Sequence, residues 1–165
     1  MESVLSTYKI LKKKAFNEII DESWIDWAIE MVEAGYESDN LYMLAGMTRP
    51  YDETGLQELT RKILLELHLD YSNKQKAIED YALFIITKTI ENPKGYLSAL
   101  RELRDICLDM GYNKDYMNFY LLYYAKDDLD GEDYQYYWDG ATKQNIDQVI
   151  KDEFSKWVTN YKNRQ

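Results

Sequence analysis

Residues 142–161, TKQNIDQVIKDEFSKWVTNY, place apolar side chains three or four positions apart along most of the stretch. These apolar positions are Ile146, Val149, Ile150, Phe154, Trp157, Val158 and Tyr161. The spacing matches one face of an α-helix and does not match the alternation of a strand. Thr142 offers a hydroxyl for the N-cap of such a helix. The stretch therefore predicts a long amphipathic helix with one buried face.

The same periodicity extends outward through most of the sequence. Trp24, Trp27 and Met31 form an earlier stripe, which Asp21 or Ser23 can cap. Further helices are expected over residues 41–45, 54–67, 73–92, 97–110 and 117–125. The breakers between these segments are Gly, Pro and Asn, which suit helix ends and turns.

Two of these segments are apolar on all sides. They contain Tyr81–Ile86 and Met117–Ala125, and such segments are typical of helices at the centre of a bundle. Thr54, with Gln57 three positions later, predicts a capping box at the start of the helix over residues 54–67. Together the segments predict an all-α fold, in which residues 1–165 form one domain. This domain is expected to be a single compact bundle of about six to eight helices.

A faint internal repeat allows a second interpretation of the same helices. Glu33–Tyr36 resembles Asp109–Tyr112, which lies 76 residues later, and each segment has a Gly expected at a left-handed helix cap. With a third turn near His68–Ser72, the chain would contain three αα-hairpins of roughly 38 residues each. Two matching segments are too few to decide between αα-hairpin repeats and a compact bundle.

The acidic side chains concentrate in two blocks without Lys or Arg, and the whole chain carries a formal charge of −10. The first block, residues 15–48, holds Glu18, Asp21, Glu22, Asp26, Glu30, Glu33, Glu37 and Asp39. The second block, residues 127–142, holds Asp127, Asp128, Asp130, Glu132, Asp133 and Asp139. Such blocks indicate a surface for a basic partner, although a solvated helix face explains the first block equally well. The charge disfavours direct binding to nucleic acid, whose phosphates require Lys and Arg.

The sequence predicts a cytoplasmic protein that does not enter a membrane. No apolar run approaches the roughly 20 residues that a membrane-spanning helix needs, and no apolar segment suited to a signal peptide follows the first residues. Cys107 is the one cysteine of the chain, which fits a reducing compartment. Because it falls on the apolar stripe of its segment, Cys107 is expected to be a core residue.

Few side chains suited to catalysis are present. With one His and one Cys, the chain lacks a His pair or Cys cluster for a metal, and it has no phosphate-binding or dinucleotide-binding loop. Residues 127–133 are rich in Asp, but alignment with an EF-hand loop puts Lys126 and Tyr137 where carboxylates are needed. We therefore expect no catalytic residue, no metal site and no cofactor.

Arg61 and His68 are the exception, and they support an alternative function. Six residues separate them on a predicted helix, so both side chains are expected on one face, about 10 Å apart along the axis. This spacing resembles the Arg-to-His motif of HEPN ribonucleases, which are small all-α proteins. The resemblance implies a dimeric ribonuclease in which His68 handles a proton and Arg61 the phosphate charge.

The second acidic block also holds four large aromatic side chains within residues 134–138. We expect this block to be a loop, because it lacks helical periodicity and contains Gly131 and Gly140. Exposed rings beside carboxylates suit a protein-binding hot spot, whereas the alternative turns Tyr137 and Trp138 inward to close the end of the bundle. The predicted partner-binding residues are Asp127, Asp128, Asp130, Glu132, Asp133, Tyr134, Tyr136, Tyr137, Trp138 and Asp139.

Residues 23–46 carry a family resemblance. Ser23–Ala28, Gly35–Ser38 and Leu41–Gly46 resemble the opening of small, acidic, helical bacterial proteins with a Trp-Ala helix, then Gly-x-x-Ser, then a Leu-x-x-Leu-Ala helix. The resemblance implies an immunity-type protein of a toxin–immunity system. Colicin DNase immunity proteins similarly present acids and a Tyr-Tyr pair to a basic nuclease, and Tyr123–Tyr124 and Tyr136–Tyr137 are such pairs here.

These features predict a non-enzymatic protein-binding inhibitor. The expected function is that of an immunity protein, which neutralises a cognate basic toxin through the second acidic block. One alternative is the HEPN-like ribonuclease, and another is an adaptor or phage-encoded inhibitor of a basic nucleic-acid enzyme. The partner's identity and the oligomeric state stay open.

Overall fold

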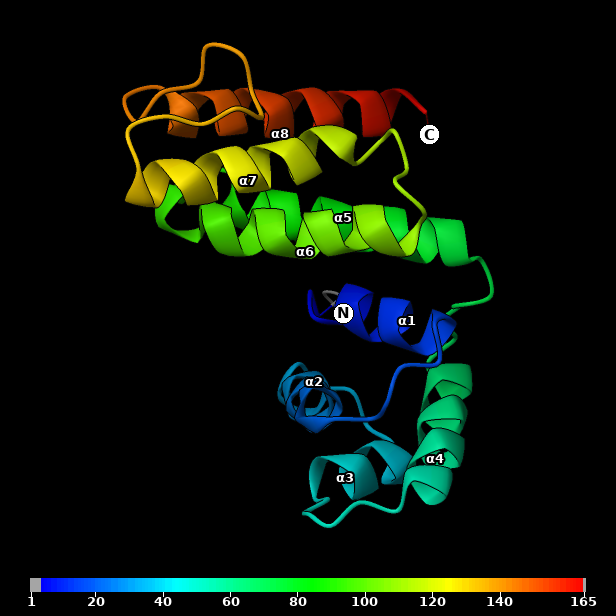
Figure 1. Ribbon diagram of the computed structural model, residues 1–165. Coiled ribbons are helices and arrows are strands. Elements are labelled where there is room, and N and C mark those ends of the chain that lie inside the picture. The colour runs from blue at the N-terminus through cyan, green and yellow to red at the C-terminus, as the bar shows by residue number, and fades with distance from the viewer. Residues whose placement is uncertain (1–3, 165) are drawn as a thin grey trace. The chain divides into compact units, whose positions relative to one another are not determined.

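The computed structural model describes residues 4–164, and every regular element in that range is helical (Figure 1). Eight α-helices are present there, so the all-α prediction is confirmed. They are α1 (Thr7–Ala15), α2 (Glu22–Glu33), α3 (Asp39–Ala45), α4 (Glu53–Glu66), α5 (Lys74–Thr89), α6 (Tyr96–Asp109), α7 (Met117–Gly131) and α8 (Ile146–Asn163), with a short 3-10 helix, η1 (Pro93–Gly95), before α6. None of the helices in this range is both long and apolar enough to cross a membrane.

The chain folds into two compact units. The boundary between them falls between Tyr81 and Ala82, inside α5. The first unit holds α1 to α4 with the beginning of α5, and the second holds the rest of α5 with α6, α7 and α8. The grouping of residues 1–165 into one domain stays a prediction, and its terminal residues 1–3 and 165 lie outside the described range.

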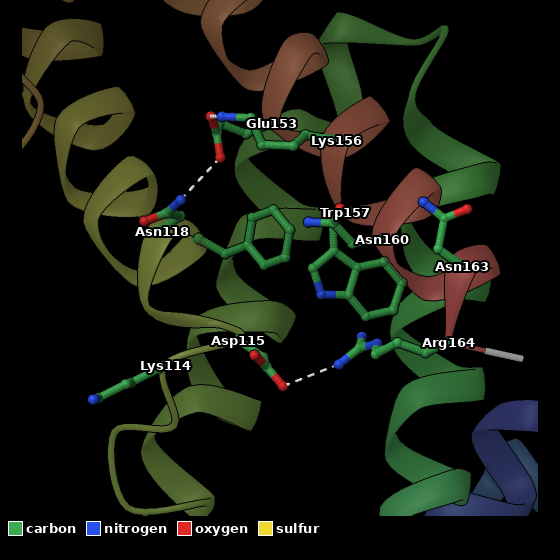
Figure 2. Close-up of a pocket in the computed structure, with 10 residues that line it drawn as sticks. Lys114, Asp115, Asn118, Glu153, Lys156, Trp157, Asn160, Asn163 and Arg164 are labelled. Carbon is green, nitrogen blue, oxygen red and sulfur yellow. Dashed lines mark hydrogen bonds and ion pairs between the residues drawn. The ribbon is translucent and has the colours of Figure 1, made fainter.

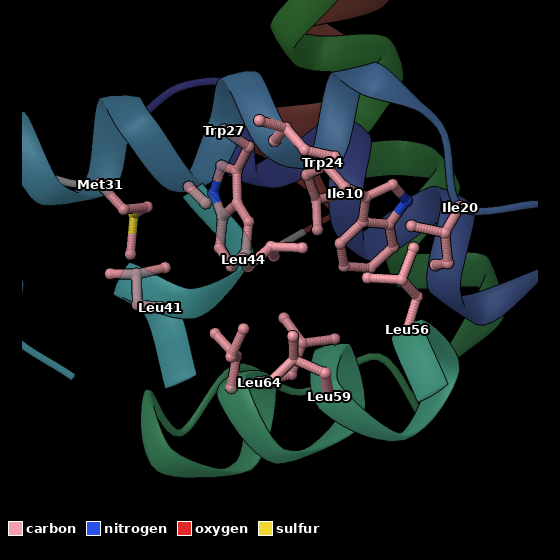
Figure 3. Packing of buried hydrophobic residues seen from close by; sticks show 13 residues of the cluster. Ile10, Ile20, Trp24, Trp27, Met31, Leu41, Leu44, Leu56, Leu59 and Leu64 are labelled. Carbon is pink, nitrogen blue, oxygen red and sulfur yellow. The ribbon is translucent and has the colours of Figure 1, made fainter. Parts of the chain in front are cut away.

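The core of the first unit is built around two tryptophans of α2. Trp24 and Trp27 are fully buried, and their ring centroids lie 6.0 Å apart in an edge-to-face arrangement. Figure 3 shows both rings pointing toward the leucines of α3 and α4. Large aromatic rings dominate the energetics of such a core because each one removes a large area from water. The stripe predicted for this helix is therefore the buried face of α2.

The ends of α2 are also as predicted. The carboxylate of Asp21 accepts a hydrogen bond from the amide of Ser23 at 3.0 Å and so caps the helix. Gly35 follows the last turn with a φ of 89°, and the amide of Tyr36 donates to the carbonyl of Met31 at 3.0 Å. This is the left-handed ending that a glycine favours, since it has no Cβ.

The N-cap predicted for α4 is wrong. The helix begins after Asp52, whose carboxylate accepts a hydrogen bond from the amide of Gly55 at 3.2 Å. Thr54 already lies inside the helix, because the carboxylate two positions earlier reaches the free amides of the first turn. The side chain of Gln57, the other half of the predicted capping box, accepts a hydrogen bond from the buried Lys14 at 2.8 Å.

The Thr142 cap predicted for α8 is also wrong, and the helix begins at Ile146. The side-chain oxygen of Asn145 accepts a hydrogen bond from the amide of Thr142 at 2.8 Å, and its nitrogen donates to the carbonyl of Gly140 at 2.9 Å. These bonds close a turn over Thr142–Asn145, so the helix starts after the turn. The predicted stripe is buried at Ile146, Ile150, Phe154, Trp157 and Tyr161.

In the second unit α6, α7 and α8 lie side by side (Figure 1). Their shared core contains a chain of rings, in which Phe154 lies 5.5 Å from Tyr96 and 5.7 Å from Phe119 between centroids. Cys107 is fully buried in the same unit, and burial raises the pKa of its thiol. A buried neutral thiol packs as a small apolar group, so the prediction that Cys107 is a core residue is confirmed.

Four of the described helices end in the same left-handed conformation. Asn17 after α1 has a φ of 51°, and the amide of Glu18 donates to the carbonyl of Lys13 at 3.0 Å. Gly35 after α2 and Gly111 after α6 have φ values of 89° and 66°. His68 after α4 has a φ of 54°, and the amide of Leu69 donates to the carbonyl of Leu64 at 2.9 Å. The turn predicted near His68 is therefore present. Because this ending is common among helices, it does not decide between αα-hairpin repeats and a compact bundle.

Gly111→Ala is expected to destabilise the protein by about 1 kcal/mol, because at positive φ the Cβ of alanine crowds the neighbouring carbonyl oxygen. Apart from its two neighbours in the chain, no residue has an atom within 4 Å of where that Cβ would be, so backbone strain sets the cost. Gly131→Ala is the matched control, since its Cβ also meets open space but its φ is not positive. Chemical denaturation should show a loss for Gly111→Ala and none for Gly131→Ala. Equal effects would rule out the strained cap.

Candidate functional site

The second acidic block is partly helical and partly a loop. α7 continues through Gly131, so Asp127, Asp128 and Asp130 lie on its last turns and only the rest of the block is irregular. The prediction of a loop is therefore wrong for residues 127–131. The last buried apolar residue of α7 is Leu129, four positions after the predicted helix end at Ala125. Its burial explains why the helix continues.

The side chain of Gln135 makes four hydrogen bonds within the loop after α7. Its oxygen accepts hydrogen bonds from the amides of Tyr137 (2.7 Å) and Trp138 (2.8 Å). Its nitrogen donates to the carbonyls of Trp138 (2.5 Å) and Ala141 (3.2 Å). A glutamine side chain offers both donors and acceptors, and here it uses both kinds to fix the backbone that carries the rings. No pattern in the sequence indicated this role for Gln135.

Three of the four predicted rings point outward. Tyr134, Tyr136 and Tyr137 are 59%, 86% and 42% exposed, whereas Trp138 is half-buried. The alternative in which Tyr137 is turned inward therefore does not hold. Tyr134 and Tyr136 also contact each other, with centroids 5.6 Å apart.

Tyr137 continues a row of tyrosines along the second unit. Its ring stacks on Tyr124 at 5.2 Å, Tyr124 lies 5.1 Å from Tyr120, and Tyr120 lies 5.8 Å from Tyr112. We call Tyr112, Tyr120, Tyr124 and Tyr137 the tyrosine ladder. Tyr112 is exposed, and Tyr120 and Tyr124 are half-buried.

Most of the tyrosine ladder was absent from the predicted site. The four-residue spacing of Tyr120 and Tyr124 is a signal that places both rings on one helix face. Desolvation by burial and the neighbouring tyrosines raise the pKa of Tyr120. The ring therefore stays neutral at physiological pH and offers an apolar face with a polar edge.

The second acidic block supplies carboxylates to the same unit, and only some of them have a cation beside them. Lys126 lies 3.2 Å from Asp130 and 3.1 Å from Asp147, and Lys143 lies 3.0 Å from Asp133. Partial burial alone would lower the pKa of Lys126, but its bonds to Asp147 and Asp130 outweigh burial and raise that pKa. Among residues 4–164, the predicted acids without an ion pair are Asp127, Asp128, Glu132 and Asp139.

One arginine of the protein already lies on a ring beside the tyrosine ladder. The guanidinium carbon of Arg104, on α6, is 4.2 Å from the ring centroid of Tyr123, which in turn lies 5.1 Å from Tyr124. The same guanidinium bonds to Asp105 at 2.6 Å. Burial lowers the pKa of Arg104, but the contact with Asp105 and the neighbouring tyrosines reverse this and raise it.

The first acidic block is less available than the sequence indicates. Three of its acids are neutralised by bases that lie outside the block in the sequence. These pairs are Glu18 with Lys12, Asp21 with Lys13, and Glu22 with Arg49. In the described part of the chain, exposed acids without an ion pair remain at Asp26, Glu30, Glu33, Glu37 and Asp39. No cluster of rings accompanies them, although Tyr42 of α3 is 47% exposed.

A groove of about 500 Å³ lies elsewhere in the second unit, beside the start of α7 and the second half of α8 (Figure 2). Trp157 lines it and is buried, and its Nε1 has no hydrogen-bond partner among the described residues. Most charged groups of the groove are paired, with Asp115 3.2 Å from Arg164 and Lys156 2.7 Å from Glu153. Asn118 also donates to Glu153 at 2.9 Å. None of the predicted site residues lines this groove.

Arg61 and His68 do not share a helix face. α4 ends at Glu66, and the positive φ of His68 turns the chain away from the helical path. Arg61 is exposed and makes two hydrogen bonds to Glu58, at 2.9 and 2.8 Å. The arrangement expected from the HEPN-like spacing is therefore wrong.

Between residues 4 and 164, no group of three or more His, Cys, Asp and Glu side chains could hold a metal ion. No protein-family model, curated protein or solved structure matches the chain. The site is thus defined by its own geometry: the tyrosine ladder, the loop fixed by Gln135, and the unpaired carboxylates beside them.

Proposed function

We propose that this protein is a binding inhibitor that neutralises a basic protein partner, as an immunity protein neutralises a bacterial toxin. The observation that carries the proposal is the exposure of Tyr134, Tyr136 and Tyr137 next to carboxylates with no ion pair in the described part of the chain. Large exposed apolar rings are costly in a soluble protein unless they contact something. In this proposal the protein acts in the bacterial cytoplasm.

The acids and the rings have different parts in the proposed complex. Carboxylates attract a basic partner over a distance and raise the association rate. Tyrosine rings supply contact area at low cost in entropy and slow dissociation. The hydrogen bonds of Gln135 hold the loop before the partner arrives, so less ordering is needed on binding.

The charge-reversal variant Asp127→Lys/Asp139→Lys tests the proposal. Its association with the co-purified product of the neighbouring gene should slow about tenfold at low salt, and the difference should shrink as salt rises. The same variant should protect cells less well when both proteins are expressed together. Stopped-flow mixing and growth assays measure the two effects.

Asp26→Lys/Glu33→Lys is the matched control, because it changes the net charge equally and its acids are also exposed and without an ion pair among residues 4–164. Association should be nearly normal for this control. If both double variants slow association equally, the effect comes from net charge alone. If neither variant changes association or protection, the proposed function is wrong.

A further inference from the structure

The tyrosine ladder indicates which basic side chain the partner presents, an inference that rests on the proposed function. We infer that the tyrosine ladder binds arginine side chains, in preference to lysine, carried one turn apart on a helix of the partner. Three features of the second unit carry this inference: an arginine already bound to a neighbouring ring, carboxylates at helical spacing from the ladder, and the distance between successive rings.

Arg104 shows how a guanidinium binds beside the tyrosine ladder. Its carbon lies 4.2 Å from the centroid of Tyr123, while two of its nitrogens donate to Asp105 at 2.9 and 2.6 Å. A planar guanidinium can stack on a ring and donate to a carboxylate at the same time. The ammonium of a lysine is compact and strongly hydrated, so it satisfies only one of these contacts well.

The exposed part of the tyrosine ladder repeats this combination without an arginine of its own. Asp127 and Asp128 follow Tyr124 by three and four positions on α7, which places ring and carboxylates on neighbouring parts of one face. Neither acid has an ion pair within residues 4–164. Tyr137 covers one side of Tyr124 and leaves its own ring 42% exposed. In the proposed complex, a guanidinium stacks on these rings, and Asp127 and Asp128 accept its hydrogen bonds.

The distance between rings fits a helix as the partner element. Successive centroids of the tyrosine ladder are 5.8, 5.1 and 5.2 Å apart. This step is close to the α-helical pitch of roughly 5.4 Å. Arginines one turn apart on a partner helix therefore meet successive rings, and the acids of α7 balance their charge.

Two synthetic peptides test the preference. Both are alanine-rich helices of equal length and equal charge, one with arginine at every fourth position and the other with lysine at the same positions. The arginine peptide should bind about tenfold more tightly, since contacts of cations with partly desolvated rings are of that order. Fluorescence anisotropy at several salt concentrations measures both affinities, and circular dichroism verifies that both peptides are helical.

Variants of Tyr137 assign the preference to the tyrosine ladder. Tyr137→Leu keeps an apolar side chain but removes the ring, so the arginine peptide should lose most of its advantage while the lysine peptide changes little. Tyr137→Phe keeps the ring and should retain the preference. Tyr42→Leu removes an equally exposed ring from the first unit and should have no effect.

Each remaining outcome overturns the inference. Equal affinity for the two peptides shows that charge alone is recognised, which contradicts guanidinium binding and leaves the proposed function standing. If the preference for the arginine peptide survives Tyr137→Leu, the arginine-binding site lies elsewhere on the surface. Failure of both peptides to bind contradicts a docking face for a basic helix. Failure of the proposed function appears instead in the charge-reversal experiment, as normal protection by Asp127→Lys/Asp139→Lys.

Discussion

Tyr137→Ala should accelerate dissociation of the partner complex about thirtyfold, the effect of losing a binding hot spot. The ring of Tyr137 stacks on Tyr124 at 5.2 Å, and its backbone amide is held by Gln135 at 2.7 Å. The side chain is therefore exposed and yet ordered, so its removal takes away contact area and uncovers Tyr124. Association should change little, because no charge is altered. Surface plasmon resonance resolves the two rates.

Tyr42→Ala is the control for this result. Tyr42 is 47% exposed on α3, close to the 42% of Tyr137, but it belongs to the first unit. Its removal should leave both rates unchanged. If Tyr137→Ala dissociates at the wild-type rate, the ring is not part of the interface. If Tyr42→Ala has the larger effect, the partner binds the first unit instead.

Trp27→Ala should cost about 4 kcal/mol of folding stability, within the range measured for buried aromatic residues replaced by alanine. Trp27 is fully buried, its ring meets Trp24 at 6.0 Å, and its Nε1 donates to the hydroxyl of Thr7 at 3.0 Å. The substitution leaves a cavity and deprives the buried Thr7 of a donor. Since domains are stable by about 5–15 kcal/mol, this loss removes a large share of the stability of the first unit, which should unfold at a clearly lower urea concentration.

Far-ultraviolet circular dichroism during urea denaturation measures this loss. Trp138→Ala is a suitable comparison, because that ring is half-buried in the loop after α7 and its backbone contacts with Gln135 do not depend on the side chain. It should cost clearly less than Trp27→Ala. Equal losses for the two variants would show that α2 does not form the core of its unit.

The helices could be predicted from the sequence because their apolar stripes are strong local signals. Trp24, Trp27 and Met31 are buried as their spacing requires, and the stripe from Ile146 to Tyr161 is buried as well. Helix starts were harder to predict, since several side chains within a few positions can accept the same amide hydrogens. Such competition explains the misplaced starts of α4 and α8.

The candidate site could be predicted only in part. Residues 127–139 were recognised by composition, and the exposure of their tyrosines could not be known from sequence. Tyr112 and Tyr137 lie 25 positions apart and join one row only because the loop after α7 folds back onto the helix. Contacts of this kind depend on tertiary packing, so no local pattern reveals them.

The pairing of the acids shows the same limit. The first acidic block contains no base in the sequence, yet Lys12, Lys13 and Arg49 reach three of its carboxylates in the fold. A block without bases in the sequence can therefore have fewer unpaired carboxylates in the fold than its composition indicates. The second block keeps four acids without an ion pair in the described residues, and it is distinguished from the first block by the exposed rings that it also holds.

The most direct test of the docking site is hydrogen–deuterium exchange of the protein, alone and in the partner complex. It shows whether the partner binds the tyrosine ladder and the second acidic block. We predict slower exchange on binding over residues 120–139, which contain the end of α7 and the loop fixed by Gln135. Residues 22–45, with α2 and α3, should exchange as they do in the free protein. Protection confined to residues 22–45, with none over residues 120–139, would contradict the proposed docking surface.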